Sequence, residues 1–333
     1  MFVKRNLGVI PILMGTWKEL AFFVVWTSLV FFLYYNLEWT FISLAIEPLS
    51  IIGIAVSFYL GFKNSQSYDR FWEARKIWGS IVNYSRTWGM QVLSMVKDSP
   101  EDQRILIYRH LAWINALRAQ LREPTSFSLD RSKSLKRHIE NYKAYGSTAE
   151  IIRTYVSEKE LETLKDRKNV ATHLMKNQGL HLKELLEGSK TSEFQNLMLH
   201  KVLEENYNFQ GACERIKNTP FPRQYAYFGT VFAWIFVLLL PFGLLNAFDE
   251  EIAKLNPSNR IWVEAAALMV SVLISWIFIT IDRVARNSED PFEGRFNDVP
   301  MTAICRTIEI DLRDMLEEQP LPEKVSPIKN ILY

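Results

Sequence analysis

The sequence predicts an all-α membrane protein with four transmembrane helices and a helical cytosolic bundle. Hydrophobic residues make up 48% of its 333 residues, and they are clustered rather than spread evenly. Four apolar runs stand out, at residues 21–35, 48–62, 224–248 and 261–281. A helix needs roughly 20 apolar residues to cross about 30 Å of hydrocarbon. The shorter runs reach that length when interfacial residues such as Trp17 and Trp39 are included.

The second apolar run continues directly into a charged, aromatic-rich helix between Ser50 and Gly79, which predicts the point where the chain leaves the membrane. Ile54, Phe58 and Phe62 stand four residues apart in the apolar half, so they form one narrow stripe on a helix. Such a stripe can line a pore. It can also face lipid or pack against another helix.

Glu47 and Pro48 stand at the start of this second run. Proline is favoured in the first turn of a helix, and a carboxylate is stabilised at the positive end of the helix dipole. Glu47 is therefore interpreted as a helix cap.

The orientation follows from basic residues near the apolar runs, because Lys and Arg are retained on the cytoplasmic side. These residues are Lys4, Arg5, Lys18, Lys63, Arg70, Arg75, Lys76, Lys217, Arg223, Arg283 and Arg286. The acidic loop at residues 249–251 is expected outside. The N-terminus has no series typical of a removable signal peptide. We expect a multi-pass protein of the cell (inner or plasma) membrane with both termini in the cytoplasm.

The runs divide the chain into six expected segments. They are a cytosolic N-terminal segment (1–20), transmembrane helices 1 and 2 (21–62, with the second helix at about 48–62), a helical cytosolic domain (63–223), transmembrane helices 3 and 4 (224–281), a cytosolic helical segment (282–318) and an extended C-terminal tail (319–333). Three prolines after Gln319 favour an extended tail over a folded element.

The cytosolic domain carries helical rather than strand periodicity. In Arg104–Arg122, apolar residues recur at helical spacing, with Arg109 and Asn115 expected on the polar side. A second such helix is expected over Ser192–Ile216. Residues 123–148 are polar and predict a connecting loop with one short helix.

The remaining composition excludes several function classes. A net charge of +2 does not indicate a nucleic-acid partner. The two cysteines, Cys213 and Cys305, fall on the expected cytoplasmic side, where we expect buried free thiols and no disulfide. The five histidines form no HExxH pair, and no GxSxG elbow, Walker loop or dinucleotide fingerprint is present. We therefore expect neither an enzyme nor a bound cofactor or metal.

Three motifs in this order resemble the bestrophin family of ion channels, particularly its compact bacterial members. They are SFYLGFKNSQSYDRFWEARKIWG from Ser57, GACERIKNTPFP from Gly211 and EDPFEGRFNDVP from Glu289. The resemblance covers the four-span layout as well as the motifs. It implies a homopentamer in a lipid bilayer, with a central pore walled by the second transmembrane helix of every subunit.

The resemblance also implies a constricted neck of three apolar rings, which Ile54, Phe58 and Phe62 match in this chain. A narrow apolar passage sheds water and closes without a plug. The edge of a Phe ring is partially positive, so rings that present their edges to the axis favour a weakly hydrated anion. In the family, Phe at the second and third neck positions is similar to the chloride-channel pattern, whereas the bacterial cation-selective type has Ile at the second.

The expected function is therefore a passive channel for small monovalent anions such as chloride. The alternative is a channel for monovalent cations on the same fold, and two charges bear on the choice. Lys63, just below the neck, would raise the local concentration of anions, whereas Glu47 near the outer mouth would favour cations if it faced the lumen. A membrane scaffold without transport is the alternative from another class.

Calcium-activated animal relatives carry a run of acidic residues after the Pro-Phe pair of the third motif, and the resemblance implies a calcium site there. This chain instead has Glu293, Gly294, Arg295, Phe296, Asn297 and Asp298 after Phe292. Calcium usually takes six to eight oxygen ligands, and Arg295 opposes a divalent cation. We therefore expect no activation by calcium.

Overall fold

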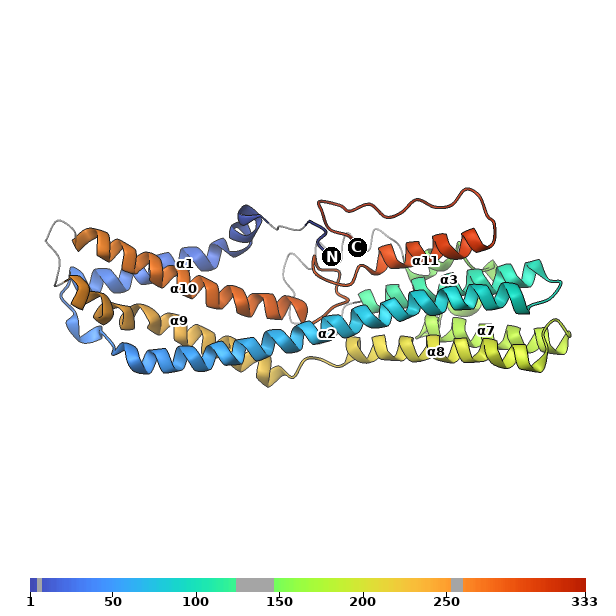
Figure 1. Ribbon diagram of the computed structural model, residues 1–333, viewed down its shortest axis with the longest axis horizontal. Helices are drawn as coiled ribbons and strands as arrows, with labels where there is room; N and C mark the ends of the chain where they lie inside the picture. Colours follow the sequence, from blue (N-terminus) through green and yellow to red (C-terminus); the bar gives the residue numbers. More distant parts are fainter. Residues whose placement is uncertain (5–7, 124–146, 253–259) are drawn as a thin grey trace. The chain divides into compact units, whose positions relative to one another are not determined.

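The computed structural model describes residues 1–4, 8–123, 147–252 and 260–333. The chain divides into two compact units (Figure 1). The apolar unit consists of Lys4–Asp69 and Phe221–Glu289. The polar unit consists of Met1–Val3, Arg70–Pro220 and Asp290–Tyr333. The predicted connector at 123–148 lies almost entirely outside the described residues, and the predicted segment boundaries stay predictions.

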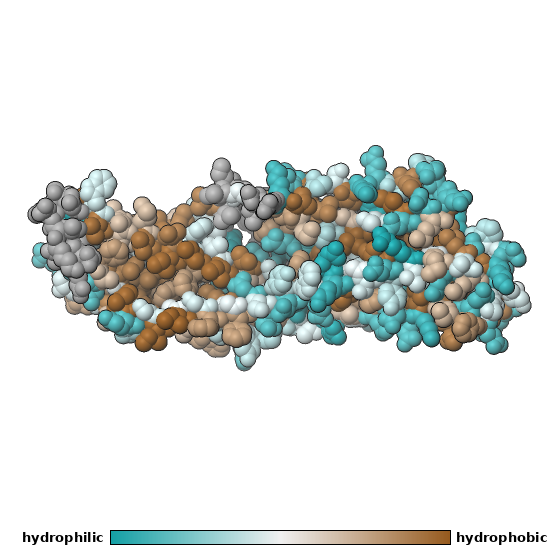
Figure 2. Space-filling view, in the orientation of Figure 1, coloured by the Kyte–Doolittle hydropathy of each residue, from teal (hydrophilic) through white to brown (hydrophobic). Residues whose placement is uncertain are grey.

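The apolar unit is built from four helices that are long and apolar enough to cross a membrane, in agreement with the four predicted spans. They are α1 (Val9–Tyr35), the first part of α2 (Ile46–Met95), α9 (Arg223–Ile252) and α10 (Arg260–Ser288). A short 3-10 helix, η1 (Thr40–Ile42), lies between α1 and α2. The hydrophobic surface in Figure 2 lies over α1, α9 and α10, where lipid can cover it.

The core of the apolar unit is formed where α1, α2, α9 and α10 pack together, around buried side chains such as Phe23, Leu60 and Phe236. Glycines allow α2 and α9 to approach closely, as small residues do between membrane helices. A Cβ atom added at Gly229 would lie 2.9 Å from Tyr59 Cε1, and one at Gly53 would lie 2.8 Å from Phe236 Cε2. Larger residues at these two positions would push the helices apart.

The polar unit is a helical bundle, and its described residues contain no strand. Its helices are the rest of α2, α3 (Pro100–Arg122), α5 (Thr148–Ile152), α6 (Glu158–Leu164), α7 (Val170–Glu187), α8 (Glu193–Asn218) and α11 (Met301–Met315). The predicted helices over Arg104–Arg122 and Ser192–Ile216 are confirmed as α3 and α8. Side-chain caps start several of these helices; in α8, Ser192 Oγ accepts the Gln195 amide.

Helix α3 is the centre of this bundle, and one prediction about it is wrong. Asn115 was expected on the polar side but is buried, and its side-chain amide donates to the carbonyl oxygen of Leu111 at 2.9 Å. The cause is that α3 packs against α5, α7, α8 and α11. A helix surrounded in this way buries its polar face as well as its apolar one.

The two ends of the described chain pair with each other inside the polar unit. The amide of Val3 donates to Asn330 O at 3.0 Å, and the amide of Leu332 donates to Met1 O at 2.8 Å. Tyr333 O also accepts the amide of Ala303 in α11 at 2.7 Å. The extended C-terminal segment is therefore attached to the bundle at its end. Separately, both cysteines are buried free thiols, as predicted.

Candidate pore-lining helix and its buried ion pair

The predicted neck stripe lies on the exposed side of α2 in the apolar unit. Ile54, Phe58 and Phe62 are 59%, 70% and 71% exposed. Successive members are separated by about 6 Å along the helix axis. Val56 and Leu60, between them in sequence, are buried in the core. Helix α2 thus has one face that packs within its own unit and one apolar face that is left uncovered.

Lys63 lies on the packed face of α2. Its Nζ donates to Asp282 Oδ1 of α10 at 2.8 Å and to the carbonyl oxygen of Ala226 of α9 at 3.2 Å. The side chains of Lys63 and Asp282 are 1% and 0% exposed. Asp282 also accepts the hydroxyl of Thr230 at 3.1 Å and pairs with Arg286 Nε at 3.0 Å. One buried ion pair therefore links three helices of the apolar unit.

The charges around Lys63 compensate one another. Glu289 Oε1 lies 4.0 Å from Lys63 Nζ, so two carboxylates face the two basic groups of Lys63 and Arg286. The expectation that Lys63 raises the local concentration of anions stays a prediction, and this compensation weakens its physical basis. The partner Asp282 was missed from the sequence. The available signal was an acidic residue at the end of an apolar run, because such a residue usually pairs within the protein.

Glu47 lies in the first turn of α2, and its side chain is exposed. This position is the one where the helix dipole stabilises a carboxylate. The proposed electrostatic role of Glu47 at the mouth of a pore stays a prediction.

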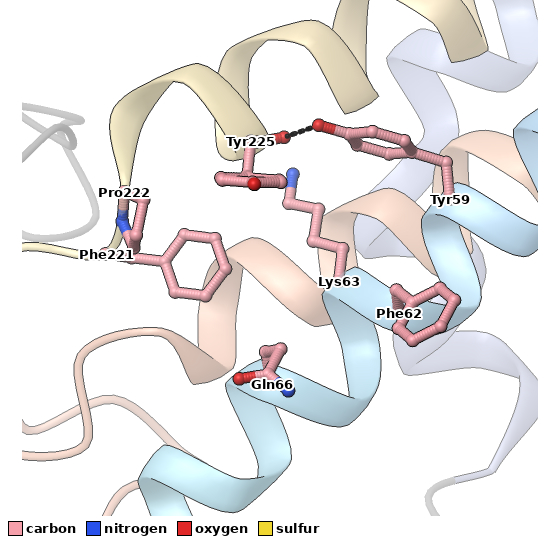
Figure 3. A pocket seen from close by; sticks show the side chains of 7 residues that line it. All are labelled: Tyr59, Phe62, Lys63, Gln66, Phe221, Pro222 and Tyr225. Atoms are coloured by element: carbon pink, nitrogen blue, oxygen red, sulfur yellow. Dashed lines mark hydrogen bonds between the residues drawn. The ribbon is translucent and has the colours of Figure 1, made fainter.

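A cavity of about 400 Å³ lies beside the end of the stripe. Its walls come from α2, from the start of α9 and from the two residues before α9, and Figure 3 shows their side chains. They are Tyr59, Phe62, Lys63, Gln66, Phe221, Pro222 and Tyr225. The hydroxyl of Tyr59 donates to the carbonyl oxygen of Tyr225 at 3.2 Å across one side. The walls are mainly aromatic, and the Lys63 ammonium is already engaged by Asp282.

The acidic residues of the third motif are bonded within the polar unit. Glu293 accepts from Lys217 Nζ at 2.7 Å, and both side chains are buried. Asp298 accepts the amide of Arg295 at 2.9 Å. Burial raises the pKa of Asp298 to about 6, against the opposing attraction of Arg122. Within the described residues, no group of three or more His, Cys, Asp or Glu side chains is arranged to hold a metal ion.

His110 and Ser85 are in contact, and a histidine beside a serine can form a catalytic pair, but these two are not placed to act as one. His110 Nε2 lies 2.8 Å from Ser85 Oγ, and both residues are fully buried. The Ser85 hydroxyl donates its one proton to the carbonyl oxygen of Ile81 at 2.6 Å, so the His110 ring must donate to Ser85. Burial lowers the pKa of His110 to about 3. Because both residues are fully buried, a substrate cannot reach this pair.

Comparison with known proteins gives consistent matches over most of the chain. A family model described as "Bacterial/Fungal Bestrophin protein" matches residues 9–314. The chain is 29% identical to the "Voltage-dependent anion channel-forming protein YneE" of Escherichia coli strain K12 over 286 residues, which are 86% of this chain and 82% of that protein. It is 23% identical to the similarly named protein sll1024 of Synechocystis over 282 residues, 84% of this chain and 80% of that protein.

A solved structure agrees with these sequence matches. A crystal structure of a bacterial bestrophin homologue from Klebsiella pneumoniae is similar with a TM-score of 0.76 and 27% identity, covering 91% of this chain and 99% of that chain. The similarity therefore extends over the helices of both units.

Proposed function

Since this chain belongs to the bacterial and fungal bestrophin family, we propose that it is a passive anion channel that assembles as a homopentamer. The second membrane helix of each subunit, the first part of α2, lines the pore. The driving force is the ion gradient, and no chemical reaction is catalysed. The channel lies in the cell membrane with both termini in the cytoplasm.

The observation that carries the proposal is the uncovered apolar face of α2. Large hydrophobic side chains that stay exposed in one chain are typical of surfaces that meet lipid or another protein. Ile54, Phe58 and Phe62 form such a surface in a narrow line. If five copies meet along this line, the three positions become three apolar rings, and a narrow apolar passage gates by losing its water.

Anions are the proposed ions because the stripe offers aromatic edges and no free carboxylate. If the rings of Phe58 and Phe62 present their edges to the pore axis, two sets of partially positive edges line the constriction. The names of the curated relatives agree with this choice. Chloride is the anion to test first.

A monovalent-cation channel is the second candidate, and the exposure of Glu47 favours it. Five carboxylates at one mouth of a pore would attract cations and repel anions. This alternative keeps the same fold and the same neck.

The deciding experiment is the reversal potential of purified protein in a planar bilayer under a potassium chloride gradient. We expect a value near the chloride equilibrium potential, and expect Phe58→Ile to move it toward that of potassium. A Phe58→Ile protein with the wild-type reversal potential would remove the main support for the ring argument. Complete absence of ion flux, in protein of the correct assembly size, would instead favour a scaffold.

We also propose that calcium does not activate this channel. Glu293 is bonded to Lys217, and Asp298 is near Arg122 and bonded to the backbone of Arg295, so neither carboxylate is available without breaking these contacts. Currents recorded with a calcium chelator and with micromolar calcium on either side of the bilayer are expected to be equal. A current that requires micromolar calcium would contradict this proposal.

A further inference from the structure

A buried ion pair ties α2 to two other helices directly after the last residue of the stripe. The Lys63 ammonium bonds to Asp282 of α10 at 2.8 Å and to the carbonyl oxygen of Ala226 of α9 at 3.2 Å. Since Phe62 precedes Lys63 in the chain, any rotation or sliding of α2 at Lys63 also moves Phe62.

The ion pair and the stripe lie on nearly opposite faces of α2. At about 100° per residue, Lys63 is roughly 140° around the helix from the middle of the stripe. Exposure agrees, because Phe62 is 71% exposed and Lys63 is 3% exposed. The pair therefore holds the face of α2 that points away from the stripe.

Other contacts fix the same region of α2 in rotation and in depth. The side-chain amide of Asn64 donates to the carbonyl oxygen of Ile281 of α10 at 3.3 Å, and the hydroxyl of Tyr59 donates to the carbonyl oxygen of Tyr225 of α9 at 3.2 Å. Gly229 lets α9 lie close to this part of α2, since a Cβ there would be 2.9 Å from Tyr59 Cε1, one turn before Lys63. The ammonium reaches the carbonyl oxygen of Ala226 because α2 and α9 are this close.

A charge buried inside a protein has few alternative arrangements. Removing one partner of a buried pair leaves the other charge uncompensated, which costs far more than losing a surface pair. Helix α2 can therefore rotate or slide only if Lys63 and Asp282 separate or move together.

We infer that the Lys63–Asp282 pair is a positioning device that holds the stripe back from the pore axis and so sets how often the neck is open. The inference rests on the proposed function, in which the stripe faces the pore. A tether on the opposite face pulls α2 toward α9 and α10. When the tether is removed, the stripe moves toward the axis, and the apolar neck closes more readily.

The test measures open probability, unitary conductance and reversal potential of single channels in planar bilayers. The variants are Lys63→Met, Asp282→Asn, the double variant with both changes, and Lys63→Arg. We expect open probability to fall at least about fivefold, the lower end of typical coupling between sites, in the first three variants. Lys63→Arg keeps a charged donor and should stay near the wild-type value. Reversal potential and unitary conductance should not change.

The double variant separates positioning from folding. It removes both charges of the pair together, so its yield of assembled protein should exceed that of either single variant. Open probability should nevertheless stay low. The matched control is Glu19→Gln with Arg283→Met, a pair at 3.0 Å between α1 and α10 that does not involve α2. This control should gate as wild type does.

Each contrary result has a distinct meaning. Wild-type open probability in the assembled double variant would overturn the inference, and so would an equal loss in the control. A shift in reversal potential in Lys63→Met would make Lys63 a source of pore potential instead, and would also overturn it. Absence of wild-type anion current would overturn the proposed function itself.

Discussion

At the scale of single residues, the chain separates its charges from the surface proposed to contact ions. The stripe on α2 carries no charge, and the basic residue that follows it turns to the opposite face and is neutralised by Asp282. Selectivity under the proposed function therefore depends on the Phe rings and on Glu47, rather than on Lys63. This division explains why a substitution at Phe58 and one at Lys63 are expected to change different measured quantities.

A second buried charge, Asp298 of the polar unit, predicts a dependence of stability on pH. Burial raises the pKa of Asp298 from 3.8 to about 6, so between these values the folded state binds a proton more tightly than the unfolded chain. The stabilisation is complete below the lower value and is lost as the pH rises through about 6. Its size is about 3 kcal/mol.

Asp298→Asn should remove this dependence, because an amide does not titrate. The measurement is the thermal unfolding midpoint of detergent-solubilised protein between pH 4 and pH 6.5. We expect the wild-type midpoint to fall, relative to the variant, as the pH rises through this range. Parallel curves for the two proteins would show that Asp298 titrates at an ordinary pKa.

At the scale of elements, α3 determines the stability of the polar unit. Its side chains are buried over most of its length, and α5, α7, α8 and α11 pack against it. From Leu106 onward, a helix in this position has little surface on which water can replace a lost contact. The cost of truncating one of its apolar side chains should therefore be near the upper part of the usual range.

Leu111→Ala tests this role of α3. Leu111 is 0% exposed, and its truncation should lower the free energy of unfolding by about 2–5 kcal/mol. Ile105 lies on the same helix at 38% exposure, so Ile105→Ala is the matched control and should cost less than about 1 kcal/mol. Chemical denaturation followed by Trp fluorescence measures both. Equal losses in the two variants would mean that α3 is not the centre of the bundle.

At the scale of the whole molecule, features that depend on a pattern along a single helix can be predicted from the sequence alone. The four membrane spans, α3 and α8 follow from the length and period of apolar residues. Features that join distant segments do not follow from it. The partnership of Lys63 with Asp282 spans 219 positions, and the pairing of Val3 with Asn330 joins opposite ends of the chain. Asn115 was assigned to the wrong environment because periodicity describes one helix and not the number of its neighbours.

Assembly around the stripe is the remaining property of the whole molecule, and chemical access to α2 tests it. Phe58 and Val25 are 70% and 69% exposed in the single chain, on α2 and on α1. In the proposed pentamer, Phe58 faces the pore, which holds water when the neck is open, and Val25 faces lipid. Phe58→Cys should therefore react with a charged, water-soluble methanethiosulfonate reagent and lose current, whereas Val25→Cys should not.

The native thiols give little background in this experiment. Burial raises the pKa of Cys305 to about 12 and that of Cys213 well above its ordinary value. Thiolates are the reactive form, so both native cysteines should react slowly. Wild-type protein treated with the same reagent is the control. If Phe58→Cys is as unreactive as Val25→Cys in membranes where the protein conducts, the stripe faces lipid, and the pore must be lined by another helix.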